Sequence, residues 1–170
     1  MNWIVFDVET TGLSPGTGHR IIEIGAVALR GTEIMSEFHS LIDCRYPISP
    51  QAQAVHGISA RMLRGAPLPE EAFAMFRDFI GPLALVAHNA PFDTRFLRAE
   101  FDQLGYPLKN KVHCTLQLSR RHWPHFPNHK LDTVFEWLGG SVDQAIHRHR
   151  ALDDARMTAF VWGKLQNISV

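Results

Sequence analysis

Residues 2–16 of the chain read Asn-Trp-Ile-Val-Phe-Asp-Val-Glu-Thr-Thr-Gly-Leu-Ser-Pro-Gly. The first part of this stretch, residues 2–8, is almost entirely apolar and rich in Trp, Ile, Val and Phe, which predicts a central strand buried on both faces. Strand alternation places Asp7 and Glu9 on one face at the end of that strand. Two like charges there are costly unless a cation or protons neutralise them. The alternative is that the strand has already ended and Glu9 is a solvated turn residue.

The remaining pattern predicts an α/β fold with a central five-stranded mixed sheet flanked by helices. Four further strands are expected at Ile21–Leu29, Ile34–Ile42, Leu83–His88 and Val112–Cys114. Helices are expected at Pro69–Ile80, Pro91–Leu104, Thr115–His122, Lys130–Leu138 and Ala151–Leu165, with short helical pieces between Pro47 and Gly65. No linker, repeat or low-complexity segment interrupts this order, so residues 1–170 are expected to form a single domain.

The composition excludes several classes of protein. The 170 residues include 17 Lys and Arg, 17 Asp and Glu, ten His and two Cys, and 45% of them are hydrophobic. The neutral total excludes a polybasic protein that binds polyanions by bulk charge, and the hydrophobic content excludes disorder. Two distant cysteines, Cys44 and Cys114, make no disulfide framework. The sequence shows neither a long apolar run nor a signal peptide, which predicts a soluble, cytoplasmic domain without a membrane span.

Asp93 is a second unusual acid. It lies three and four residues before Phe96 and Leu97 on the helix expected at 91–104, and therefore opens the row of side chains that faces the core. This helix follows the strand at 83–88, and α/β folds bind ligands beyond the carboxyl ends of their strands. The alternative is that Asp93 only interacts with the helix dipole.

The segment 147–155, which reads His-Arg-His-Arg-Ala-Leu-Asp-Asp-Ala, is the third unusual feature. Asp154 begins a core-facing row at helical spacing, whereas Asp153 is expected to face water. His149 lies just outside the helix and can reach the same cavity as Asp154. The alternatives are a basic surface loop, or a zinc fragment made by His147 and His149, for which the sequence offers no convincing third ligand.

Four carboxylates that converge at one end of a sheet cannot all stay ionised without divalent cations. Oxygen ligands of this kind suit Mg²⁺ or Mn²⁺ better than zinc. Two such ions can clamp the attacking and leaving oxygens of a phosphoryl displacement, while a neutral histidine deprotonates the attacking water. The residues alone therefore indicate metal-assisted phosphodiester hydrolysis.

Three segments resemble, in order, the exonuclease motifs of the DEDDh family: Phe6–Leu13, His88–Asp93 and His149–Ala155. This DnaQ-like family includes the proofreading epsilon subunit of bacterial DNA polymerase III, ribonuclease T, oligoribonuclease and exonuclease X. The segments at 47–58 and 119–124 look closest to exonuclease X. The resemblance implies a ribonuclease H-like fold and the 3′ to 5′ removal of nucleoside monophosphates.

The resemblance also implies roles for individual residues. Asp7, Glu9 and Asp154 match the positions around a first metal ion, Asp7 also matches the bridge to a second ion, and Asp93 matches the remaining acid. His149 matches the general base. The positions that match the substrate-binding residues are Thr10, Thr11, Gly12, Leu13, Val55, His56, Asn89 and Phe92. Alternatively, Val55 and Phe92 are ordinary core residues and His56 caps a turn.

The neutral charge total conceals two unlike parts of the chain. Residues 1–104 hold 8 basic and 12 acidic side chains, net −4, whereas residues 105–170 hold 9 and 5, net +4. The second part contains a basic stretch interleaved with aromatic rings, which favours contact with phosphates and stacking on single-stranded bases. This stretch comprises Lys109, Lys111, His113, Arg120, Arg121, His122, Trp123, His125, Phe126, His129 and Lys130. The alternative is a solvated surface with Trp123 and Phe126 in the core.

The leading hypothesis is a 3′–5′ exonuclease that uses two Mg²⁺ or Mn²⁺ ions on single-stranded or frayed DNA ends. The rivals are the same chemistry on RNA, a polymerase proofreading subunit, a non-catalytic nucleic-acid-binding module and a ribonuclease H-type endonuclease. Because the chain ends at Val170, just after the last expected helix, a free-standing enzyme is favoured over a proofreading subunit. The expected partner is nucleic acid, and a homodimer or a polymerase partner stays open.

Overall fold

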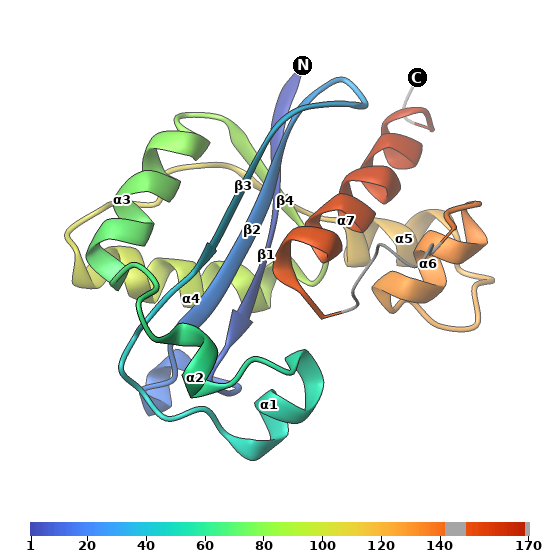
Figure 1. The fold of residues 1–170 in the computed structure, drawn as a ribbon. Helices are drawn as coiled ribbons and strands as arrows, with labels where there is room; N and C mark the ends of the chain where they lie inside the picture. The colour runs from blue at the N-terminus through green and yellow to red at the C-terminus, as the bar shows by residue number, and fades with distance from the viewer. Residues whose placement is uncertain (142–148, 169–170) are drawn as a thin grey trace.

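A five-stranded mixed sheet forms the centre of the computed structural model, which describes residues 1–141 and 149–168. The strands lie in the order β3-β2-β1-β4-β5 (Figure 1). Their bounds are β1 Asn2–Thr10, β2 Ile21–Arg30, β3 Glu33–Leu41, β4 Ala84–Ala87 and β5 Val112–Cys114. The neighbouring pairs β1–β2 and β2–β3 are antiparallel, whereas β1–β4 and β4–β5 are parallel. The predicted mixed α/β sheet is thereby confirmed.

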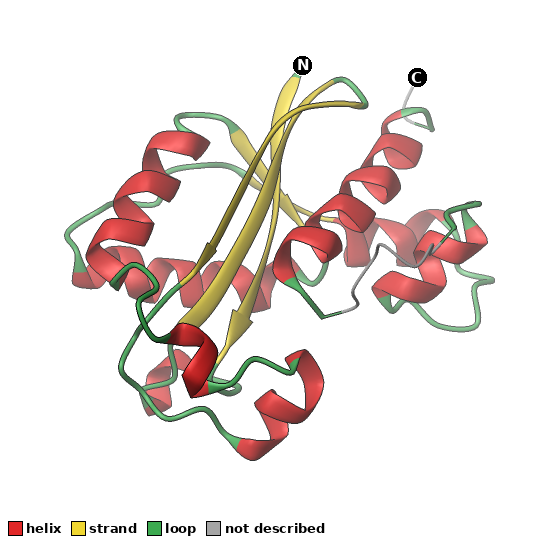
Figure 2. Ribbon diagram, viewed as in Figure 1, coloured by secondary structure: helices red, strands yellow, loops and turns green. Residues whose placement is uncertain are grey.

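Helices cover both faces of this sheet (Figure 2). The helices are α1 Pro50–His56, α2 Ala60–Leu63, α3 Pro69–Ile80, α4 Ala90–Gln103, α5 Thr115–His122, α6 Leu131–Trp137 and α7 Ala151–Gln166, with a short 3₁₀ turn at Pro15–Thr17. α3 and α4 pack on one face, and α5, α6 and α7 pack on the other. No helix within 1–141 or 149–168 is long and apolar enough to cross a membrane.

The alternation of β1 divides the interior into two cores. Ile4, Phe6 and Val8 point toward α3 and α4, where Phe6 packs against Phe76 with ring centroids 6.2 Å apart. Val5 points the other way, into the core beneath α7. Asp7 and Glu9 lie on the α7 face because they follow Val5 at a spacing of two residues. The buried apolar rows thus fix which face of the sheet receives the two acids.

The end of β1 has no strand partner on one side. β4 pairs with β1 only from Trp3 to Val5, so the last residues of β1 extend beyond β4. The start of α4 lies there instead, and the Asp93 carboxylate accepts a hydrogen bond from the backbone N–H of Val8. This is the open end of a parallel strand pair, where α/β sheets place their ligands.

Candidate metal and nucleic-acid site

Three carboxyl groups meet at the end of β1. One carboxylate oxygen from each of Asp7, Glu9 and Asp154 lies within 4.8 Å of the other two, and the three residues are partly buried. Asp7 and Glu9 come from one face of β1, and Asp154 comes from the first turn of α7, which packs across β1 and β2. The structure thus joins the ends of two elements that are separated by about 140 residues of sequence.

Asp93 lies close to these three carboxyl groups but is not among the residues whose oxygens lie within 4.8 Å of one another. The residue is buried in the first turn of α4, with 2% of its surface exposed. Its charge is the neighbouring charge that most raises the pKa of Asp7, after the effect of burial. The carboxylate also accepts hydrogen bonds from its own N–H and from that of Val8. Asp93 is therefore a fourth acid fixed beside Asp7.

Burial is the largest cause that raises the pKa of every carboxyl group in this cluster, and the charges of neighbouring acids raise it further. The pKa of Asp7 lies well above its usual value, that of Glu9 is about 9, that of Asp93 about 8 and that of Asp154 about 7. Such groups are ionised together only if a positive charge compensates them. All of the donor atoms are oxygens, the ligands that hard divalent cations prefer. The cluster therefore fits a divalent metal.

Glu23 is a buried acid at the site that the sequence patterns did not single out. It lies opposite Glu9 in the β1–β2 pairing and is completely inaccessible to solvent. Burial alone would raise the pKa of Glu23, but hydrogen bonds from His39, Arg150 and the N–H of Ala151 outweigh that effect and lower it to about 2. A glutamate inside the apolar run Ile-Ile-Glu-Ile of an expected strand was the available signal.

Gly25 allows α7 to approach the sheet. A Cβ atom on this residue would lie 2.2 Å from the backbone nitrogen of Leu152 and 2.3 Å from the carbonyl carbon of Ala151. Gly25 is paired with Asp7 across β1 and β2. The missing side chain is thus what brings the first turn of α7, with Asp154, over the acids of β1.

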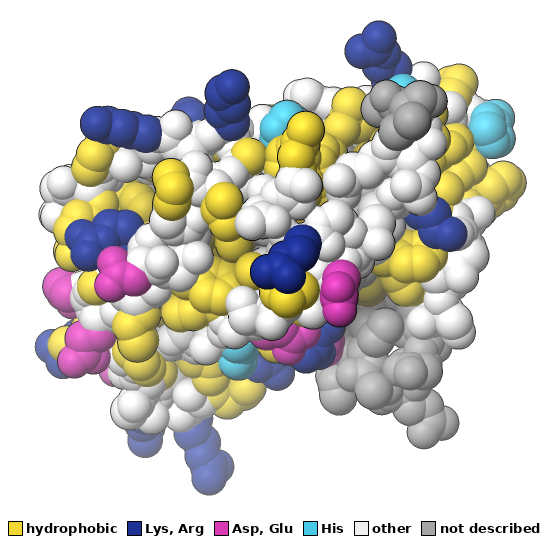
Figure 3. Space-filling view, turned by 90° about the horizontal axis from the view of Figure 1, so that it is seen from above, with side chains coloured by type: hydrophobic (Ala, Val, Ile, Leu, Met, Phe, Trp, Pro, Cys, Tyr) yellow, Lys and Arg dark blue, Asp and Glu magenta, His cyan; other side chains and the backbone are white. Residues whose placement is uncertain are grey.

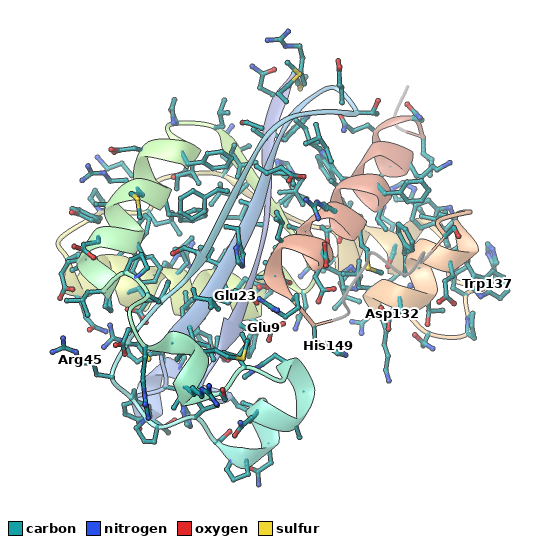
Figure 4. The ribbon with its side chains drawn as sticks, in the orientation of Figure 1. Glu9, Glu23, Arg45, Asp132, Trp137 and His149 are labelled. Carbon is teal, nitrogen blue, oxygen red and sulfur yellow. The ribbon has the colours of Figure 1, made fainter. Side chains whose placement is uncertain are left out.

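His149 immediately precedes the α7 N-cap residue Arg150, at the same end of the sheet as Glu9 and Glu23 (Figure 4). Its backbone has φ 59°, a left-handed conformation that is uncommon for a residue other than glycine. Its N–H donates to the carboxylate of Asp154, which ties the histidine to the acidic cluster, while its side chain is exposed. His147, and with it the zinc alternative, lies outside the described residues.

A pocket of about 300 Å³ opens beside Glu9. It contains six of the eight residues expected to bind substrate: Thr10, Gly12, Leu13, Val55, His56 and Phe92. Leu13 and Val55 present exposed apolar surface, 81% and 56% of their maximum, so Val55 is not a core residue. The pocket therefore combines an acidic edge with exposed apolar side chains.

The other two expected residues lie elsewhere. Thr11 is fully buried, and its Oγ1 lies 3.0 Å from Nδ1 of His19. Asn89 is exposed at the N-cap of α4, in the left-handed region with φ 64°, and does not line the pocket. His56 has two functions, because Nδ1 accepts the N–H of Ile58 at the end of α1 while Nε2 donates to the carbonyl of Thr10. It therefore caps its turn as well as lining the pocket.

Two expectations about individual side chains are wrong. Asp153 does not face water: it is buried and accepts a 2.8 Å hydrogen bond from Arg156, which also binds Glu37 of β3. Phe126 is buried in the core beneath α7, and the ring of Trp123 stacks on it at 5.6 Å between centroids. Phe126 is thus unavailable for stacking on bases.

The sheet topology and the oxygen-only cluster at its open end fit the class of metal-dependent hydrolases. The chain belongs to the exonuclease family, because the family model described as Exonuclease (RNase_T) matches residues 4–161. The predicted membership of an exonuclease family is thereby confirmed.

Solved structures of exonucleases share this fold. Exonuclease X in complex with 5′-overhanging duplex DNA matches with a TM-score of 0.80 at 30% identity, over 98% of this chain and 92% of that chain. The nuclease domain of 3′hExo, a DEDDh family member bound to rAMP, matches with a TM-score of 0.81 over 98% and 92% of the two chains. At 20% identity, this second match supports the fold alone.

Curated relatives include much longer polymerases. DNA polymerase III PolC-type of Caldanaerobacter subterraneus subsp. tengcongensis is 39% identical over 172 residues, which cover 99% of this chain and 12% of the relative. The corresponding protein of Clostridium perfringens is 39% identical over 157 residues, which cover 92% and 11%. The chain thus spans about an eighth of the length of these relatives.

Proposed function

We propose that residues 1–170 act as one exonuclease domain that removes nucleoside 5′-monophosphates from the 3′ end of DNA with divalent metal ions. The observation that carries this proposal is the position of the acidic cluster. Asp7, Glu9 and Asp154 lie within 4.8 Å of one another, and Glu9 also forms one edge of the 300 Å³ pocket. A terminal nucleotide in that pocket would place its phosphate beside the carboxylates.

The residues that would hold the metal are Asp7, Glu9, Asp93 and Asp154. Bound Mg²⁺ or Mn²⁺ would neutralise the phosphate and lower the pKa of a nearby water. Without such ions, the raised pKa values of the four carboxyl groups keep protons on the cluster near neutral pH.

The chain's own residues would orient the substrate and move the proton. Leu13, Val55 and Phe92 offer apolar surface to the terminal sugar and base, while Thr10 and Gly12 line the same pocket beside the 3′-hydroxyl. His149, in its neutral form, takes a proton from the water that attacks phosphorus. The bond from phosphorus to the 3′ oxygen of the preceding nucleotide breaks, and that oxygen takes a proton from solvent.

DNA is the proposed substrate because the match to exonuclease X, solved with duplex DNA, is at 30% identity over nearly the whole chain. An exoribonuclease is the alternative, and it would need to recognise the 2′-hydroxyl. Digestion of 5′-labelled single-stranded DNA, frayed duplex DNA and short RNA separates the two. A descending ladder on DNA supports the proposal, whereas a ladder on RNA alone contradicts it.

A pair of variants tests whether the digestion depends on the charge of the acidic cluster. Asp7→Asn keeps the size of the side chain but removes its charge, and it should lower the rate by at least about 10³-fold. EDTA should lower the rate of the parent by a similar factor, and excess Mn²⁺ should restore it. Asp78→Asn removes a carboxylate that is 74% exposed and should leave the rate unchanged. Equal rates for Asp7→Asn and the parent would refute the site assignment.

A second candidate is a proofreading domain within or beside a DNA polymerase. The specific observation is the 39% identity to PolC-type polymerases over 99% of this chain. Proofreading predicts faster removal of a mismatched than of a paired 3′ nucleotide when the matching polymerase is present. Equal removal of the two termini with and without the polymerase would favour the free-standing enzyme.

A further inference from the structure

Glu23 binds the start of α7 from the neighbouring strand. Its Oε1 accepts hydrogen bonds from Nη2 of Arg150 at 2.6 Å, from Nε of Arg150 at 3.0 Å and from Nε2 of His39 at 2.7 Å. Its Oε2 accepts the backbone N–H of Ala151 at 3.1 Å. Both oxygens of Glu23 are therefore occupied by protein donors, one of which is the guanidinium of Arg150.

The first N–H of α7 needs a hydrogen-bond acceptor from outside the helix, because the side chain of its N-cap residue provides none. The N-cap residue is Arg150, whose side chain makes no capping hydrogen bond, and Ala151 provides the first N–H of the helix. The first N–H groups of a helix have no partner inside it, and a negative charge near them is stabilising. Glu23, which lies on β2, accepts the N–H of Ala151 and places a negative charge beside the start of α7.

The residues on either side of this contact belong to the proposed site. His149 precedes Arg150 and adopts φ 59°, a conformation that persists only when its surroundings hold it. Its N–H donates to the carboxylate of Asp154, so the same turn determines the positions of both residues. In addition, Glu23 lies opposite Glu9, so the anchor of α7 and a cluster acid occupy paired positions of β1 and β2.

We propose that Glu23 is a positioning residue: through Arg150 and the N–H of Ala151, it holds the first turn of α7 so that Asp154 stays within ligand distance of Asp7 and Glu9. The same contact keeps His149 beside the cluster. This inference rests on the proposed function. It assigns a role to a residue that lies outside the three motif segments and whose two carboxylate oxygens accept hydrogen bonds from protein donors.

The test compares Glu23→Gln with Glu37→Gln. Glutamine at position 23 keeps the shape and can still accept the Ala151 N–H, but it loses the charge that holds Arg150. Glu37→Gln breaks another ion pair of the same helix, between Glu37 and Arg156, on its exposed side. Both variants are measured well below their thermal unfolding midpoints, first for Mn²⁺ affinity by calorimetry without DNA and then for kcat and KM on an oligonucleotide.

The expected result is selective. Glu23→Gln should weaken Mn²⁺ binding by about 10- to 100-fold and lower kcat by a similar factor with little change in KM, as for residues that orient metal ligands. Glu37→Gln should stay within about twofold of the parent in both. Unchanged Mn²⁺ affinity in Glu23→Gln would overturn the inference, and so would an equal loss in Glu37→Gln.

A second pair of variants covers a failure of Glu23→Gln to fold. Arg150 is one-third exposed, so Arg150→Gln removes the contact with less damage to the core and should weaken Mn²⁺ binding likewise. Arg150→Lys keeps the charge and should recover part of the affinity, whereas equal affinities for the two variants would contradict the proposal. A parent without exonuclease activity would refute the proposed function, while the calorimetry would still decide the role of Glu23.

Discussion

Glu9 illustrates how strongly a single carboxyl group in the site depends on its surroundings. Burial, followed by the charges of Asp154, Glu23 and Asp93, raises its pKa to about 9, against a small opposing effect of Arg150. A carboxyl group whose pKa rises on folding binds its proton more tightly in the native state. Its contribution to stability is therefore complete below about pH 4.5 and is lost as the pH rises through about 9.

The corresponding prediction concerns the metal-free protein. In EDTA, the parent should unfold at progressively lower temperature as the pH rises from about 5 to about 9, and Glu9→Gln should lose less over this range. Differential scanning calorimetry of the two proteins measures the difference. Saturating Mg²⁺ should flatten the profile of the parent, because binding to the native state alone stabilises it. A flat profile of the parent in EDTA would contradict the electrostatic account of the cluster.

The four acids of the cluster could be predicted from the sequence because each follows a local periodicity. Asp7 and Glu9 alternate with the buried residues of β1, and Asp93 and Asp154 open core-facing rows of helices. Asp153 could not be placed in this way, because its burial depends on Arg156 bridging α7 to Glu37 of β3. That contact joins residues more than a hundred positions apart, which no local pattern encodes.

At the scale of elements, the site depends on how closely α7 approaches β2. The sequence predicted both elements and their order, but not this distance, because it is set by the absence of a side chain at Gly25. The position of the buried charge of Glu23 could not be predicted for a related reason, since its partners Arg150 and Ala151 lie 127 and 128 residues away in the sequence. Strand and helix patterns therefore predict which elements carry the site residues better than they predict how closely those elements pack.

Gly25→Ala tests this docking. The added methyl group would lie against the backbone of Leu152, which cannot turn aside as a flexible side chain can, so α7 must shift outward. We expect a loss of about 1–3 kcal/mol in the free energy of unfolding, measured in urea, together with a lower kcat. Gly16→Ala is the control, because the nearest atom to its Cβ would be Oγ of Ser14 at 3.5 Å. A Gly25→Ala variant as stable and active as Gly16→Ala would show that the approach is not critical.

At the scale of the whole molecule, the basic stretch of the second part of the chain is divided between the two ends of the sheet. Lys109 and Lys111 precede β5, which runs parallel to β1, so they lie at the end opposite the acids. Arg120 is close to His88 at the carboxyl end of β4, on the side of the acids. On the described surface seen from the end where both termini lie, Lys and Arg are scattered singly (Figure 3). Phosphate contacts are therefore expected near α5.

This division predicts unequal effects of salt on substrate binding. Arg120 and Arg121 are exposed in the last turn of α5. The double variant Arg120→Ser/Arg121→Ser should therefore raise KM for an oligonucleotide. It should also reduce the slope of log KM against log salt concentration by about 1.4, which is about 0.7 for each lost phosphate contact. Lys109→Ser/Lys111→Ser makes the same change in net charge at the opposite end of the sheet and should leave the slope near that of the parent. A mononucleotide ester, which has no upstream phosphates, should give the same KM for all three proteins. Equal slopes for the two double variants would mean that the protein attracts DNA through its overall charge, and would remove α5 from the proposed substrate surface.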